Sequence, residues 1–169
     1  MSFIKYIGID PDTTTTGIGY IMDDGTPEVV LLRAKGRYMD DRYLEMSRKL
    51  VELFEDLADQ RLFTPGTQIA IEGQHIRYNE RNPKSILGLQ TVVGMAIAAV
   101  SSVTDLVYVP IPSKWKGSVP KEVHHRRILR ELGVDLDDAM FHGIAGGQKQ
   151  HVVDALGMAL WLKRGRSIS

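Results

Sequence analysis

Residues 6–20 read YIGIDPDTTTTGIGY, two short apolar runs joined by an acidic, threonine-rich turn. The first run has the β-branched and aromatic residues of a strand, and Pro11 cannot donate to a β-ladder, so this strand ends near Asp10. The threonines and Gly17 resume extended structure, which predicts a hairpin. The carboxylate of Asp10 then lies at the end of a buried strand, where it either caps the turn or meets a cation.

The rest of the chain alternates strands with helices. Strands are predicted by short β-branched runs over residues 1–9, 16–22, 28–34, 68–72 and 105–110. A first helix is predicted from residue 40 or 41 up to a break at Thr64-Pro65-Gly66, and further helices over 83–102, 118–133 and 148–164. Residues 112–120 and 135–147 are predicted as loops, the second with a short helical turn. Three antiparallel strands followed by strands separated by helices predict an α/β fold with a five-stranded mixed sheet flanked by helices, in a single domain over 1–169.

The composition is that of an ordinary globular domain, with 43% hydrophobic and 25% charged residues in 169. The absence of cysteine excludes disulfides and thiolate metal sites. We find no signal-peptide pattern and no apolar run long enough for a membrane span, so we expect a cytoplasmic protein without a membrane partner.

The net charge is zero, so a nucleic-acid partner has to be argued from where the charge lies. Residues 114–130 hold six basic residues against one acid, Glu122. The bases are Lys114, Lys116, Lys121, Arg126, Arg127 and Arg130. This segment forms either one basic face of the molecule or only the solvated surface of a helix.

Acidic residues end two similar strands, Asp10 in IGID and Glu72 in IAIE. If these strands are parallel neighbours, both acids emerge at the same edge, where open α/β sheets place their sites. In the last helix His151 and Asp154 share one face at i, i+3 spacing. Individually, Asp154 could cap a neighbouring helix and His151 could be a partly buried histidine. Together, oxygen and imidazole ligands without cysteine favour Mg²⁺ or Mn²⁺, with two ions clamping a phosphoryl displacement.

These motifs, in this order, resemble RuvC-type Holliday junction resolvases over nearly the whole chain. The resemblance also rests on Gly88-Leu89-Gln90, Gly94, Trp115-Lys116, Lys121-Glu122-Val123 and HVVDALGMAL at 151–160. It implies a ribonuclease-H-like fold and a homodimer that cuts two symmetric strands of a four-way DNA junction with Mg²⁺ or Mn²⁺. It also implies that Asp10, Glu72, His151 and Asp154 form the catalytic, metal-binding set. Lys116 and Lys121 would contact DNA near the scissile phosphate, and Lys121 would stabilise charge that develops there.

The chain departs from the family pattern at several positions. Asp12 stands where the family usually has glycine, Trp115 replaces an aliphatic residue, and the loop from Trp115 to Lys121 is short. His75 stands near the position of an expected aromatic wedge. These differences suggest a divergent, phage-encoded member that accepts branched DNA more generally.

The expected DNA-binding residues lie in two segments: Arg77, Tyr78, Arg81 and Lys84, and Lys114, Trp115, Lys116 and Lys121. Tyr78 and Trp115 could stack on unpaired bases, although Trp115 could equally anchor its loop to the core. The small-residue helix over 83–102 is either a dimer face or is buried within the monomer.

Three other functions fit parts of the sequence. The first hairpin resembles the phosphate loop of actin-like ATPases and sugar kinases, but that fold needs two such domains. A catalytically dead module that binds branched DNA is a second alternative. The main alternative is a ribonuclease-H-fold nuclease acting on other branched DNA, single strands or RNA–DNA hybrids.

Overall fold

A computed structural model describes residues 2–73 and 83–166. All five strands belong to one sheet, in the order β3-β2-β1-β4-β5. They are β1 (Ile4–Asp10), β2 (Thr15–Met22), β3 (Pro27–Arg33), β4 (Phe63–Ile71) and β5 (Val107–Tyr108). The helices are α1 (Met39–Asp59), α2 (Pro83–Val100), α3 (Pro112–Trp115), α4 (Lys121–Leu132) and α5 (Gly146–Lys163), with a 3₁₀ turn at Ala139–Phe141.

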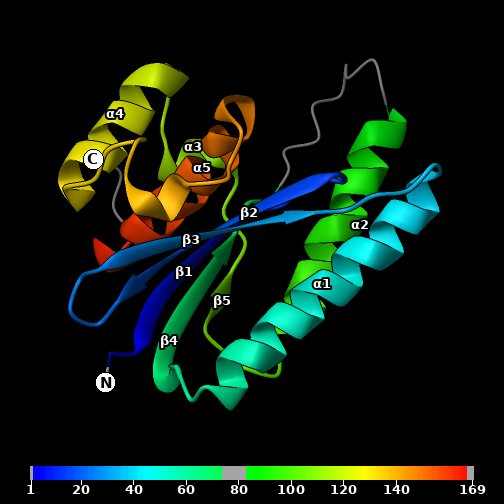
Figure 1. Cartoon of the computed structure of the whole chain (residues 1–169), viewed down its shortest axis with the longest axis horizontal. Coiled ribbons are helices and arrows are strands. Elements are labelled where there is room, and N and C mark those ends of the chain that lie inside the picture. The colour runs from blue at the N-terminus through cyan, green and yellow to red at the C-terminus, as the bar shows by residue number, and fades with distance from the viewer. Residues whose placement is uncertain (1, 74–82, 167–169) are drawn as a thin grey trace.

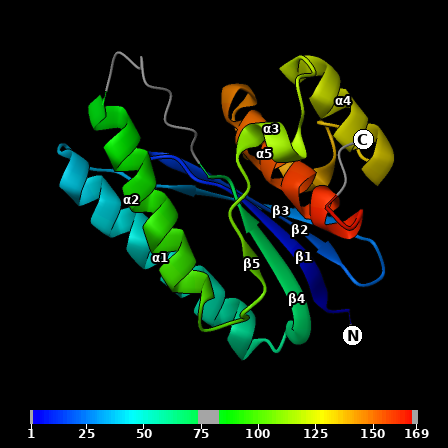
Figure 2. The same cartoon turned by 180° about the vertical axis from the view of Figure 1, so that it is seen from behind.

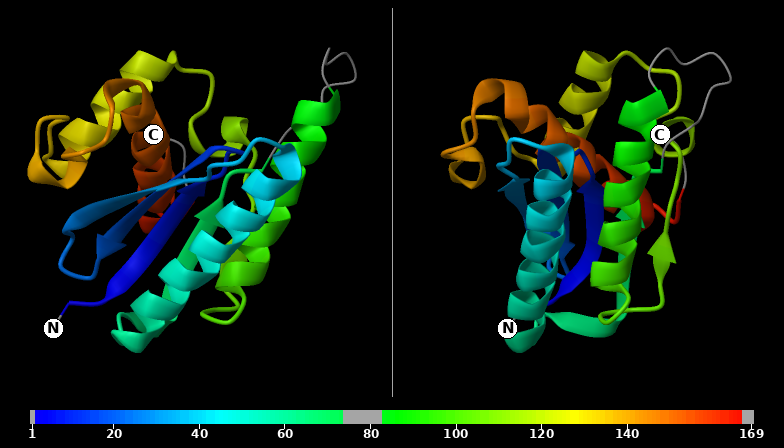
Figure 3. Two further views of the ribbon diagram at one scale, coloured as in Figure 1. Left: turned by 45° about the vertical axis from the view of Figure 1, so that its right-hand side comes forward. Right: turned by 90° about the vertical axis from the view of Figure 1, so that its right-hand side faces the viewer.

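Helices cover both faces of the sheet. Figures 1 and 2 show α1 and α2 on one face and α5 on the other, with α4 packed on α5. In Figure 3 α1 and α2 run side by side. The predicted α/β class and the five-stranded mixed sheet are confirmed.

The pairing of β1 brings the two strand-ending acids together. β1 is antiparallel to β2 and parallel to β4, with Ile9 opposite Ile71. The backbone N–H of Glu72 donates to the carbonyl of Ile9 at 2.9 Å. Asp10 and Glu72 therefore leave the sheet next to each other at its carboxyl edge, as the two similar strands predicted.

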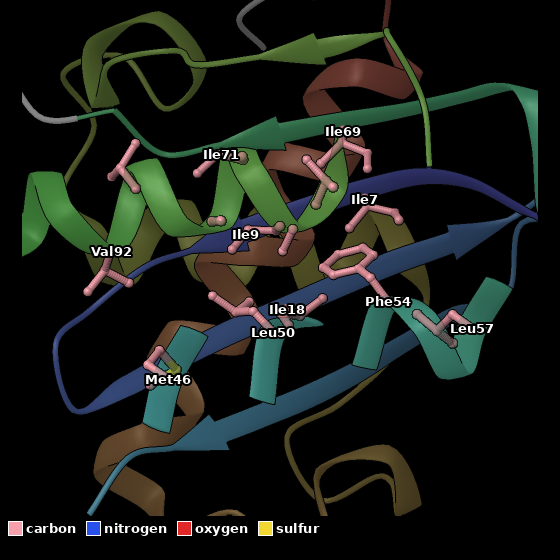
Figure 4. Close-up of a cluster of buried hydrophobic side chains, with 14 of the residues drawn as sticks. Ile7, Ile9, Ile18, Met46, Leu50, Phe54, Leu57, Ile69, Ile71 and Val92 are labelled. Carbon is pink, nitrogen blue, oxygen red and sulfur yellow. The ribbon is translucent and has the colours of Figure 1, made fainter. Parts of the chain in front are cut away.

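One face of the sheet carries the larger apolar core. Ile7 and Ile9 of β1 lie with Ile69 and Ile71 of β4 beneath the apolar stripe of α1 (Figure 4). That stripe includes Met46, Leu50, Phe54 and Leu57, which are all buried. Because side chains alternate along a strand, Gly8, Asp10, Ala70 and Glu72 face the other side, toward α5.

On that other side, glycines let α5 lie directly on the strands. A Cβ atom added to Gly8 would come within 1.9 Å of the Ala155 carbonyl oxygen, and one on Gly17 within 2.3 Å of the His151 backbone. One on Gly19 would come within 2.6 Å of the Leu156 nitrogen. The helix carrying His151 and Asp154 is thereby held against the hairpin that carries Asp10.

The predicted break after α1 is misplaced. The helix begins at Met39, and the carboxylate of Asp41 accepts the backbone N–H of Tyr38 at 3.3 Å, so Asp40 and Asp41 lie in the first turn. The chain reverses at Arg61, whose φ is 55°. Thr64-Pro65-Gly66 instead belongs to β4, where the register against β1 slips between Phe63 and Gln68. Pro65 is tolerated there because an irregular segment needs no ladder hydrogen bond from it.

The segment before α4 also differs from its prediction. Residues 112–115, expected as loop, form the short helix α3 with Pro112 in its first turn. α4 begins at Lys121 rather than Ser118, and it ends as predicted at Gly133, whose φ is 68°. Among the described residues, no helix combines the length and apolar character that a membrane crossing requires.

Candidate active site

A cavity of about 430 Å³ opens at the carboxyl ends of β1 and β4. Its walls come from the β1–β2 turn, α1, α2, α5, the segment between β5 and α4, and the first residue of α4. The charged side chains and histidine that line it are Asp10, Asp12, Arg42, Glu72, Lys116, Lys121, His151 and Asp154. The predicted convergence of Asp10, Glu72, His151 and Asp154 is confirmed, and their catalytic role remains a prediction.

Asp10 is buried and contacts α5. Its Oδ2 lies 2.8 Å from Nδ1 of His151, because the close approach at Gly17 brings this turn of α5 onto the hairpin. The hydrogen bond with Asp10 raises the pKa of His151 despite the opposing effect of burial. The pair thus joins the first strand to the last helix at the base of the cavity.

Glu72 is buried beside another acid. Its Oε1 accepts hydrogen bonds from Nε1 of Trp115 at 3.1 Å and from Nζ of Lys116 at 3.3 Å. Burial, with a further contribution from the charge of Asp10, raises the pKa of Glu72 to about 7, although Lys116 opposes the shift. A cation placed between the two carboxylates would relieve this repulsion.

Asp154 is buried and held by two residues of α4. His125 Nε2 lies 2.8 Å from Oδ1, and Lys121 Nζ lies 3.1 Å from Oδ2. Burial alone would raise the pKa of Asp154, but the hydrogen bond with His125 and the charges of His125, Lys116 and Lys121 together lower it. His125 was not predicted as a site residue. The sequence does place His125 four residues after Lys121, which puts both side chains on one face of a helix and could have indicated that His125 belongs to the site.

Trp115 lies in the core and forms part of this site. It is 1% exposed, and its ring packs edge-on against His124 with the centroids 5.1 Å apart. Burial lowers the pKa of His124 to about 4, so this histidine is neutral at pH 7 and serves in packing. The expected stacking of Trp115 on a base is wrong for this structure, because its ring offers almost no surface. The alternative, that it anchors its loop to the core, is the one observed.

The other predicted residues differ in their placement. The Asp12 carboxylate accepts the backbone N–H groups of Thr13 and Thr14, so it holds the turn while lining the cavity. Lys114 is exposed and lies in a separate hollow beside Tyr108 and Arg166. Arg77, Tyr78, Arg81 and His75, and the side chain of Lys84, lie outside the described part of the chain.

The donor set fits a hard divalent ion. It consists of carboxylate oxygens and imidazole without any cysteine. In residues 2–73 and 83–166, no three His, Asp or Glu side chains lie close enough together to hold one ion. The carboxylates are turned toward Lys116, Lys121, His125 and His151 instead. Basic side chains therefore balance the charge of the acids in this cavity.

Comparison with solved structures identifies the architecture. The chain superposes on Thermus thermophilus RuvC in complex with a Holliday junction substrate with a TM-score of 0.65 at 19% sequence identity. The alignment covers 95% of this chain and 96% of that one. A second T. thermophilus RuvC structure gives a TM-score of 0.63 with the same identity and coverage. This chain has the RuvC fold.

The resemblance inferred from sequence is thus confirmed for the ribonuclease-H-like fold over nearly the full length. No family model and no curated protein sequence matches the chain. The divergent, phage-encoded origin therefore stays a prediction.

Proposed function

We propose that this chain is a divalent-metal-dependent endonuclease that resolves four-way DNA junctions by paired, symmetric nicks. The observation that carries the proposal is the convergence of Asp10, Glu72, His151 and Asp154 on one cavity of a RuvC fold. A RuvC of the same fold has been solved with a Holliday junction substrate, which supports a branched DNA as the substrate here.

Asp10, Glu72, His151 and Asp154 would hold Mg²⁺ or Mn²⁺, two ions in each site. When bound, such ions supply an activated water and neutralise charge on the phosphate under attack. The protein's own contribution is to fix the ligands. Gly17 lets α5 carry His151 to Asp10, and Trp115 orients the Glu72 carboxylate by its indole N–H.

Lys116 and Lys121 would contact the DNA near the scissile phosphate. Their ammonium groups now pair with Glu72 and Asp154. With cations at those carboxylates, both ammonium groups would be released to donate to phosphate oxygens. Lys121 is 45% exposed at its side chain, so it can turn toward an incoming strand without disturbing the core. It would stabilise the negative charge that grows on the phosphate during cleavage.

The substrate class is tested by offering the purified protein a four-way junction, a Y-fork, a linear duplex and an RNA–DNA hybrid, with mapped cut sites. We expect symmetric nicks on the four-way junction, dependent on Mg²⁺ or Mn²⁺ and abolished by chelator. Preferred cutting of the fork, single strands or the hybrid would support the alternative nuclease. Cutting that persists with chelator would contradict the metal mechanism, and binding without cutting would identify a binding module.

Lys121→Ala should lower the cleavage rate more than the junction affinity. Loss of one positioned donor to a developing charge typically costs about 10²–10³-fold in rate, whereas one lost phosphate contact weakens binding only modestly. Single-turnover cleavage and metal-free binding separate the two effects. Lys114→Ala is the matched control, because Lys114 is exposed outside the cavity and should change affinity alone. A pure affinity loss for Lys121→Ala would make it a DNA-positioning residue.

The proposed homodimer would bury apolar residues of α1 and α2. Leu44 is 70% exposed and Leu87 is 68% exposed. They flank the close approach of the two helices, where a Cβ on Gly88 would lie 2.1 Å from the Tyr43 hydroxyl oxygen. An obligate interface needs such an apolar surface.

Leu87→Glu should therefore convert a dimer to a monomer in light scattering and uncouple the two nicks. Leu136→Glu, at an exposed leucine near the 3₁₀ turn, is the control and should leave the mass unchanged. A wild-type protein that is monomeric at micromolar concentration would argue against the dimer.

A further inference from the structure

Arg42 lines the cavity from the side opposite the other cationic residues. It lies in the first turns of α1, which covers the sheet face away from α5. Lys121 and His151 enter the same cavity from α4 and α5. Arg42 belongs to a helix that contains more acidic than basic residues. Neither the charge pattern of this helix nor the family resemblance predicts a role for Arg42 in the site.

Arg42 also differs from the other cationic side chains of the cavity in its pairing. Lys116 contacts Glu72, Lys121 contacts Asp154 and His151 contacts Asp10. Among the residues that the structure describes, Arg42 forms no ion pair, and its buried Nε has no hydrogen-bond partner. A guanidinium remains charged at any ordinary pH, and a buried donor without an acceptor is costly. Arg42 therefore brings to the cavity wall a positive charge that no carboxylate of the described residues pairs with.

The carboxylates of the cavity are not free to pair with that charge. Asp10 and Asp154 are engaged with α5 and α4, and the Asp12 carboxylate accepts the backbone of its own turn. The Glu72 carboxylate accepts hydrogen bonds from Trp115 and Lys116. A DNA strand entering the cavity carries a phosphate every few ångströms, and a planar guanidinium binds a phosphate through two parallel hydrogen bonds.

We infer that Arg42 binds a backbone phosphate of the DNA strand in the cavity, from the side opposite Lys121, and so positions that strand across the carboxylates. This inference rests on the proposed action on DNA. Lys121 would hold the phosphate at the reacting position, and Arg42 would hold a neighbouring one. Arg42 is then a positioning residue, and its loss should act on affinity and on the register of the cut.

The test pairs protein variants with single neutral methylphosphonates placed along the strand around the mapped cut site. For the wild-type protein, the substitution at the phosphate that Arg42 binds should weaken metal-free junction binding about tenfold or more, as for a charged hydrogen bond. Arg42→Gln should bind unmodified junctions more weakly than wild type by the same factor. A methylphosphonate at that one position should weaken its binding no further. Arg42→Lys, which keeps the charge without the paired donors, should recover part of the loss.

Arg48→Gln is the matched control, since Arg48 lies on the same helix and pairs with Glu52 at the surface. At every methylphosphonate position, Arg48→Gln should lose as much junction affinity as the wild-type protein does. If both Arg42 variants show that same loss at every position while the wild type binds and cuts junctions, the inference is overturned and the proposed function stands. If the wild type neither binds nor cuts DNA, the proposed function itself fails. Thermal unfolding of each variant is measured first. If Arg42→Gln does not fold, the inference is tested with Arg42→Lys alone.

Discussion

Asp10→Asn is expected to abolish strand cleavage and to leave junction binding intact in metal-free buffer. The substitution removes a carboxylate that is 7% exposed and lies 2.8 Å from His151, at the centre of the candidate metal site. Losing a metal ligand removes several kcal/mol of transition-state stabilisation, which corresponds to roughly a thousandfold or more in rate. Binding should hold or tighten, because the change removes one negative charge that repels the DNA backbone.

The natural control is Asp12→Asn, two residues along the same turn. The Asp12 side chain accepts backbone N–H groups of the turn, and the asparagine carbonyl can do the same. We expect it to cleave within about tenfold of wild type, because the turn geometry is kept. Single-turnover cleavage at saturating protein and a metal-free gel-shift titration measure the two properties. Substantial cleavage by Asp10→Asn would remove Asp10 from the catalytic set. If Asp10→Asn cleaves normally and Asp12→Asn does not, Asp12 rather than Asp10 would be the catalytic carboxylate of this turn.

The site could be predicted from the sequence wherever local periodicity determines the geometry. Asp10 and Glu72 end strands of matching character, and each lies two residues beyond a small residue, Gly8 or Ala70, on the same face. Strand alternation therefore puts both acids on one side of the sheet. The i, i+3 spacing of His151 and Asp154 does the same for α5. These patterns depend only on the strand and helix repeats, so a single sequence suffices to find them.

The remaining features depend on contacts between distant segments. Nothing local to Trp115 shows that the segment after β5 folds into a short helix and packs the ring into the core beside Glu72. Arg42 joins the cavity only because α1 begins at the carboxyl edge of the sheet. The turn at Arg61 uses a positive φ without glycine, which is uncommon enough that Thr64-Pro65-Gly66 was the stronger signal. Local propensity is overridden in each of these places by the packing of the whole domain.

Gly17→Ala is expected to destabilise the fold strongly, although it adds only one methyl group. The added methyl carbon would lie 2.3 Å from the carbonyl carbon and oxygen of His151, and these are backbone atoms that cannot rotate away. Overpacking of a core typically costs about 1–3 kcal/mol and more when backbone has to move. We therefore expect a loss of about 3 kcal/mol or more in the free energy of unfolding, measured by urea denaturation. Gly94→Ala is the matched control. The added Cβ there meets nothing within 4 Å, and alanine in a helix should stabilise by about 0.5–1 kcal/mol.

Gly17→Ala should also reduce cleavage in the molecules that remain folded. Relief of the clash requires α5 to move off β2, and this movement carries His151 away from Asp10. A displacement of about 1 Å at a reacting centre can cost on the order of a hundredfold in rate. We expect such a loss at a temperature well below the unfolding transition, where reduced stability alone would leave the rate unchanged. A variant that is destabilised yet cleaves at the wild-type rate would show that the close approach at Gly17 serves the fold alone. A variant as stable as wild type would show that α5 does not rest on this strand.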